Sequence, residues 1–79
     1  MSFNKISIIG LGYIGLPTAA LFANSGIQVL GVDVNQNIVN TIQQGRIHFV
    51  EPDLENIVCQ HVKEGGLRVS TSVEQSDVF

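Results

Sequence analysis

A glycine motif near the amino terminus constrains the fold of this chain more than any other feature. Gly10, Gly12 and Gly15 form the pattern G-x-G-x-x-G, which directly follows the apolar run 6–9. A short β-branched run that is apolar on both faces is typical of a central strand in a parallel sheet. Pro17 and the alanine-rich stretch after it are typical of the first turns of a helix. The sequence therefore predicts a strand, a tight glycine turn and a helix in succession.

The rest of the chain alternates between strand-like and helix-like segments. The expected features are a stop signal at Gly26, a strand at 28–34, a helix capped by Asn35 and ended by Gly45, a loop at 46–51, a helix from 52–53 to 65–66, a strand at 67–71 and the start of another element at 75–79. This β-α-β-α-α-β order predicts an α/β fold. We expect the amino-terminal part of a Rossmann-type doubly wound parallel sheet with right-handed crossovers.

The position of the glycine motif is that of a dinucleotide-binding turn. Gly10 permits the tight turn, Gly12 lets a pyrophosphate approach the backbone, and Gly15 lets the helix pack close to the sheet. The N–H groups at the start of a helix, together with the positive end of its dipole, bind phosphates. The backbone amides of Tyr13 and Ile14 are therefore candidate phosphate donors.

An acidic residue lies at the end of the second predicted strand. Asp33 follows the glycines at close to the spacing of about 20 residues found in such sites. Its carboxylate is expected to accept hydrogen bonds from the adenosine ribose hydroxyls, and its charge would repel a 2′-phosphate. No arginine directly follows Asp33 to offset that charge, so NAD is predicted rather than NADP. Glycine turns also occur in α/β proteins that bind no dinucleotide, and a purely structural turn is the alternative.

The sequence resembles the UDP-glucose/GDP-mannose dehydrogenase family. The resemblance rests on Gly-Leu-Gly-Tyr-Ile-Gly-Leu-Pro at 10–17, Gly-Val-Asp-Val-Asn at 31–35 and the block 45–54. In this family the third block commonly ends in Glu-Pro-Gly-Leu, and here Asp53 replaces that glycine. This departure, the Ile47-His48 pair and residues 67–71 are most similar to members that act on UDP-N-acetyl-D-mannosamine. The resemblance covers essentially the whole sequence.

The resemblance implies an NAD-dependent enzyme that oxidises the primary alcohol of a UDP-N-acetylhexosamine to a carboxylate in two steps. In this family a cysteine forms thiohemiacetal and thioester intermediates, and it lies with the catalytic lysine and asparagine far beyond Phe79. Residues 1–79 would then be an incomplete NAD-binding domain, without the central dimerisation helix and the UDP-sugar domain. They would carry cofactor residues and no catalytic residue. The complete protein would be a homodimer or a larger homo-oligomer.

Several other reactive side chains have simpler interpretations. Cys59, the only cysteine, falls inside a predicted helix, so a packing role is expected and an internal disulfide is excluded. His48 and His61 lack metal-ligand spacing, and no metal site is predicted. Asp53 is expected to cap the third helix. An approach of the loop at Glu51 to the cofactor or to a partner domain stays open.

Charge and composition argue against two further classes of protein. The 79 residues carry a net charge of −3 and only four scattered Lys and Arg residues, so no basic stripe is available for a nucleic acid. No segment approaches the about 20 apolar residues of a membrane span, and the amino terminus lacks a signal-peptide pattern. We expect a cytoplasmic protein without nucleic-acid or membrane partners.

Two alternative functions remain open on the residues alone. They are a non-catalytic nucleotide-sensing module and an FAD-binding flavoenzyme domain, since both use the same glycine motif. In the Rossmann strand order 3-2-1-4, the first strand needs a neighbour that residues 1–79 barely begin. We therefore expect these residues alone to be inactive, to bind NAD weakly, and to be marginally stable or self-associating.

Overall fold

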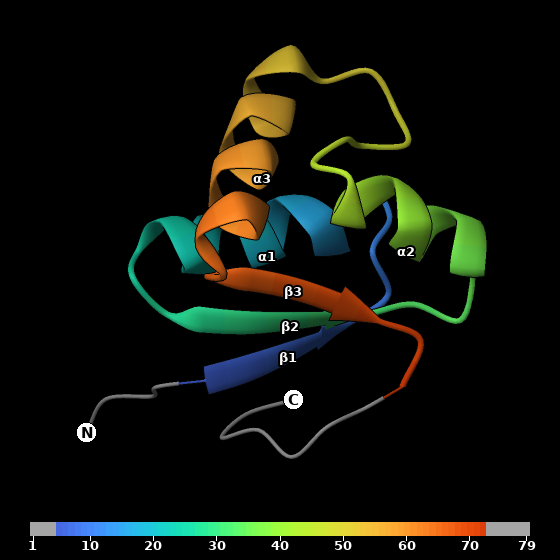
Figure 1. Cartoon of the computed structure of the whole chain (residues 1–79), viewed down its shortest axis with the longest axis horizontal. Coiled ribbons are helices and arrows are strands. Elements are labelled where there is room, and N and C mark those ends of the chain that lie inside the picture. The colour runs from blue at the N-terminus through green and yellow to red at the C-terminus, as the bar shows by residue number, and fades with distance from the viewer. Residues whose placement is uncertain (1–4, 73–79) are drawn as a thin grey trace.

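The computed structural model describes residues 5–72 and contains the expected succession of elements (Figure 1). The elements are β1 (Lys5–Ile9), α1 (Gly15–Asn24), β2 (Gln28–Val32), α2 (Gln36–Gln43), α3 (Pro52–Glu64) and β3 (Leu67–Ser70). The predicted β-α-β-α-α-β order is confirmed. The element expected at 75–79 lies outside the described residues.

The three strands form one parallel sheet in the order β1-β2-β3. The register pairs Ile6 with Val29, and Val29 with Leu67. Two successive right-handed crossovers that move in the same direction place their helices on the same face of a sheet. Figure 1 shows this arrangement, with α1, α2 and α3 on one side of the strands. The fold is therefore the β1–β3 half of a Rossmann-type sheet, as predicted.

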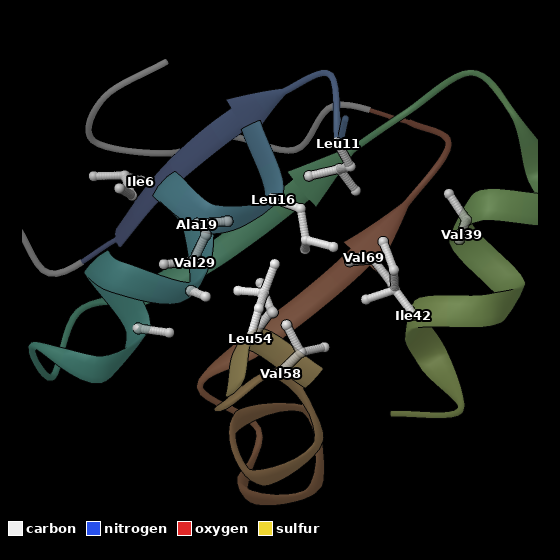
Figure 2. Packing of buried hydrophobic residues seen from close by; sticks show 13 residues of the cluster. Ile6, Leu11, Leu16, Ala19, Val29, Val39, Ile42, Leu54, Val58 and Val69 are labelled. Carbon is white, nitrogen blue, oxygen red and sulfur yellow. The ribbon is translucent and has the colours of Figure 1, made fainter. Parts of the chain in front are cut away.

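The core lies between the sheet and these helices, and Figure 2 shows its side chains converging there. It comprises Ile6, Leu11, Leu16, Ala19, Ala20, Ala23, Val29, Val39, Ile42, Leu54, Val58, Leu67 and Val69. Leu11 is fully buried although it belongs to the glycine turn. It fits because Gly31 of β2 has no side chain: a Cβ there would lie 2.8 Å from Leu11 Cδ2. Burial of Leu11 anchors the turn to the sheet.

The predicted helix boundaries follow the capping residues closely. Asn35 caps α2, and its Oδ1 accepts hydrogen bonds from the amides of Asn37 and Ile38. Gly65 ends α3 in the left-handed conformation, with φ 84°, which glycine adopts without steric cost. The predicted strands were slightly too long, since β2 ends at Val32 and β3 at Ser70.

One capping prediction was wrong. Asp53 does not cap α3, because the helix already begins at Pro52 and its N-cap residue is Glu51, which makes no side-chain capping bond. Proline favours the first helical position because its ring presets φ, and this sets the boundary one residue earlier. Asp53 instead lies in the first turn, where its negative charge favours the helix dipole.

Candidate dinucleotide site

The glycine turn joins the carboxyl end of β1 to the start of α1. Gly10 has φ 89°, a left-handed conformation that glycine accommodates, and its amide donates to the Val32 carbonyl at 2.7 Å. The Leu16 amide then donates to the Gly12 carbonyl at 3.1 Å and begins the helix. The turn is therefore tied to the end of β2 on one side and to α1 on the other.

The second and third glycines meet different surroundings. A Cβ on Gly15 would lie only 1.7 Å from the Gly10 carbonyl oxygen, so no larger residue fits without moving α1. A Cβ on Gly12 would meet nothing within 4 Å. Gly15 is thus required by the protein's own packing. Gly12 opens onto free space, the arrangement that the approach of a pyrophosphate requires.

The start of α1 presents free amides. Among the described residues, none accepts a hydrogen bond from the amides of Gly12, Tyr13 or Ile14. The Tyr13 and Ile14 side chains are 78% and 82% exposed, so both residues lie at the surface. Unbonded N–H groups at a helix start are an anion-binding arrangement. This geometry fits the phosphate-donor role predicted for Tyr13 and Ile14.

Asp33 lies beside this turn, just beyond the end of β2. Its Oδ2 accepts a hydrogen bond from the Leu11 amide at 2.9 Å, and its Oδ1 accepts one from the Asn35 amide at 2.9 Å. The hydrogen bond from Leu11 lowers the pKa of the Asp33 carboxyl most, followed by that from Asn35. Desolvation opposes them, and the charge of His48 adds a smaller lowering. Asp33 is therefore an ionised acceptor held in place by two backbone donors.

The carboxylate retains capacity for a ligand. Each ionised oxygen has two acceptor sites, and each oxygen of Asp33 uses one of them for a backbone amide. A shallow hollow of about 180 Å³ adjoins the carboxylate. Its lining is mostly apolar and comprises Ile9, Gly10, Val32, Asp33 and Val34. An acidic acceptor beside an apolar hollow and a turn with free amides together fit a dinucleotide.

The structure brings loop 46–51 against the glycine turn, and it does so through Phe49 rather than through Glu51, the residue at which the sequence left such an approach open. The Phe49 ring, in loop 46–51, packs against the Tyr13 ring with centroids 4.6 Å apart, and the His48 ring meets Phe49 edge-on at 4.9 Å. Leu11 and Asn35, as backbone donors to Asp33, were also missed. Backbone donors carry no residue-type signal, so only the three-dimensional structure could identify them.

The remaining candidates lie apart from the dinucleotide site. Cys59 is exposed on α3, and its sulfur lies against Gly45. His61 pairs through Nε2 with the Asn24 Oδ1 at 3.1 Å, which links α3 to α1. Within residues 5–72, no group of three or more His, Cys, Asp or Glu side chains could hold a metal ion. None of the helices in this range is long and apolar enough to cross a membrane.

Comparisons with known proteins agree with this geometry. The chain is 56% identical over 77 residues to a UDP-N-acetyl-D-mannosamine dehydrogenase of Campylobacter jejuni, covering 98% of this chain and 19% of that protein. It is 53% identical over 79 residues to an NDP-N-acetyl-D-galactosaminuronic acid dehydrogenase of Ralstonia nicotianae, and this match covers 100% of this chain and 19% of that protein. The chain therefore spans about a fifth of the length of these relatives.

A solved structure and a family model extend the comparison. The native structure of the UDP-N-acetyl-mannosamine dehydrogenase from Staphylococcus aureus matches with a TM-score of 0.91 and 48% identity, over 95% of this chain and 18% of that one. Residues 4–79 match the model of the UDP-glucose/GDP-mannose dehydrogenase family, NAD binding domain. NAD is accordingly the cofactor that the glycine turn and Asp33 fit. The chain belongs to the UDP-glucose/GDP-mannose dehydrogenase family and forms part of its NAD-binding domain.

Proposed function

We propose that this chain is the NAD-holding part of a dehydrogenase that oxidises the primary alcohol of a UDP-N-acetylhexosamine to the uronate. UDP-N-acetyl-D-mannosamine is the proposed sugar, because relatives at 56% and 57% identity are named for it. The observation that carries the proposal is the Asp33 carboxylate, held by two backbone amides beside the open glycine turn. An ionised acceptor in that place favours NAD over a cofactor with a 2′-phosphate.

The proposed reaction consumes two NAD⁺ and one water for each sugar nucleotide. Bound NAD⁺ supplies the hydride acceptor in each of two successive oxidations, first of the alcohol and then at the level of the aldehyde. The described residues contribute binding: the amides of Tyr13 and Ile14 hold the pyrophosphate, and Asp33 holds the adenosine ribose. Gly12 leaves the space that the phosphates need.

The catalytic groups are proposed to lie outside residues 1–79. The site described above holds no nucleophile: Cys59 lies on α3, against Gly45, and not beside the glycine turn. We therefore propose a longer protein with a separate UDP-sugar domain and a helix that forms a homodimer or larger homo-oligomer. The UDP-sugar would bind mainly to that second domain, and this one would present the cofactor to it.

The test is to assay the complete protein for NADH formation with UDP-N-acetyl-D-mannosamine. The expected result is two NADH per UDP-sugar, with NAD strongly preferred to NADP. UDP-N-acetyl-D-galactosamine is the essential comparison substrate, because one relative is named for the galactosaminuronic acid. A preference for that sugar would overturn the proposed substrate. NAD binding without NADH formation from any nucleotide sugar would point to a nucleotide sensor, and co-purifying FAD to a flavoenzyme.

A further inference from the structure

Loop 46–51, between α2 and α3, is held in place at two points. Its inward-facing residues are Ile47 and Phe49, which are half-buried and pack against the core, whereas His48 and Val50 are exposed. The Ile47 amide donates to the Glu55 Oε2 of α3 at 3.3 Å, which fixes the first point. The second point is the contact of Phe49 with Tyr13. The loop therefore bridges α3 and the glycine turn.

The contact of Phe49 with Tyr13 acts on the turn itself. Tyr13 occupies an x position of G-x-G-x-x-G, and its amide is among those without an acceptor in the described part of the chain. Its side chain is 78% exposed, yet its ring lies 4.6 Å from the Phe49 ring at an interplanar angle of 42°. This separation is within the range of favourable aromatic pairs. Phe49 thus restricts where Tyr13, and with it the free amides, can lie.

A second ring of the same loop extends this contact. The His48 ring meets the Phe49 ring edge-on, with the two centroids 4.9 Å apart. Loop 46–51 therefore places two rings in series beside the exposed Tyr13 ring. By comparison Val50, in the same loop, is 94% exposed.

We propose that Phe49 is a positioning residue for NAD: packed on Tyr13, it holds loop 46–51 against the glycine turn and keeps the turn's amides in their binding geometry. The proposal rests on NAD binding at this turn, which the proposed function also requires. Phe49 acts through Tyr13 and is not itself expected to contact the pyrophosphate. Its loss should weaken NAD binding more than it changes turnover at saturating NAD.

The experiment measures the Kd of NAD by calorimetry in the complete protein for Phe49→Ala, Tyr13→Ala and the double variant. Each single variant should raise Kd about three- to tenfold, since one aromatic pair is lost in each. The double variant should be little worse than either single one, because both remove the same interaction. Phe49→Tyr should restore affinity to within about twofold of the wild type. The NAD KM should rise with the Kd, while kcat at saturating NAD stays within about twofold.

Val50→Ala is the matched control in the same loop and should leave the Kd of NAD unchanged. Phe49→Ala also removes partly buried area, so thermal unfolding is measured alongside the Kd. In Tyr13→Ala a loss of stability is not expected to account for weaker NAD binding, because Tyr13 is 78% exposed. An unchanged Kd in folded Tyr13→Ala, or additive effects in the double variant, would overturn the proposal. A wild-type protein that bound no NAD would instead refute the proposed function.

Discussion

At the residue scale, the site depends on the hydrogen-bond partners of one carboxylate and on the space around two glycines. Asp33 is held by the amides of Leu11 and Asn35, so its carboxylate contributes to the local fold as well as being the proposed acceptor for the adenosine ribose. Gly15 is required by packing against Gly10, whereas Gly12 faces open space. These differences separate the glycine that the packing requires from the glycine that is proposed to make room for NAD.

The first prediction concerns cofactor choice. Asp33→Ala in the complete protein should weaken NAD binding by about 1.5–3 kcal/mol, the cost of losing charge-assisted hydrogen bonds. It should also narrow the preference for NAD over NADP, because a repelling charge is removed. Competition binding with both cofactors measures the effect. Asp53→Asn, which removes an exposed charge on α3, is the control. Equal affinity of the wild type for NAD and NADP would contradict the assignment.

The second prediction concerns pH. The two amide hydrogen bonds lower the pKa of Asp33 below its ordinary 3.8, so folding favours the ionised form. The stability that Asp33 contributes is therefore present above about pH 3.8 and declines as the pH falls through the lower, folded-state pKa. A carbon-13 titration should give a midpoint below 3.8 for Asp33. The difference in the free energy of unfolding between the wild type and Asp33→Asn should become smaller at acid pH. A difference that does not depend on pH would refute the argument.

The third prediction distinguishes the two glycines. Gly15→Ala should lower the thermal stability, because its Cβ would lie 1.7 Å from the Gly10 carbonyl oxygen. Gly12→Ala should fold normally, since its Cβ meets no atom within 4 Å, and yet lose NAD affinity. Gly66→Ala is the control, with an ordinary 3.6 Å contact to His61. Thermal unfolding and calorimetry on the same samples separate these outcomes, and equal losses of stability in both motif variants would disprove the distinction.

At the scale of elements, the start of α2 is coupled to the site. Asn35 caps the helix through its side chain and supports Asp33 through its backbone amide. The helix begins at Gln36, so the residue that caps it lies only two positions beyond Asp33. The start of α3 differs, because Glu51 makes no side-chain capping bond and the helix relies on its initial proline.

The fourth prediction follows from these two roles of Asn35. Asn35→Ala should destabilise α2 by about 1 kcal/mol, the usual cost of losing a capping side chain. The backbone donor to Asp33 remains in this variant, so NAD affinity should fall far less than in Asp33→Ala. Hydrogen exchange over 36–43 measures the helix, with Asn37→Ala as the control in the same turn. Unchanged exchange in Asn35→Ala would contradict a capping role.

At the scale of the whole molecule, the described sheet is one-sided. All three helices cover the same face, and within residues 5–72 β1 pairs only with β2. Ile9, at the carboxyl end of β1, is 58% exposed, and Ile14 on the adjoining turn is 82% exposed. An apolar strand edge of this kind is a template for pairing with another strand.

The fifth prediction concerns residues 1–79 produced alone. We expect self-association and a broad, weakly cooperative thermal transition. The reason is that one edge of β1 has no partner strand within residues 5–72, and the exposed Ile9 and Ile14 side chains lie near it. Light scattering during size-exclusion chromatography measures the mass. A monomer that unfolds cooperatively would refute this expectation.

The sequence by itself determined the elements and indicated the candidate binding residues, because their signals are local. A left-handed turn at Gly65, a cap at Asn35 and an acidic residue at the end of β2 each follow from the conformational or hydrogen-bonding needs of a few neighbouring residues. The wrong prediction of a cap at Asp53 shows the limit of such signals. Pro52 and Asp53 both favour the start of a helix, and the local sequence did not show that the helix already begins at Pro52.

Only the tertiary structure decided how the site is held together. The Leu11 amide meets Asp33 across 22 residues of sequence, and Phe49 meets Tyr13 from a different loop. These contacts depend on the sheet register and on the path of loop 46–51, which no local pattern specifies. The close approach of Gly15 to the Gly10 carbonyl oxygen likewise arises only when α1 packs onto the end of β1. Long-range packing therefore converted a recognisable motif into a site of defined geometry.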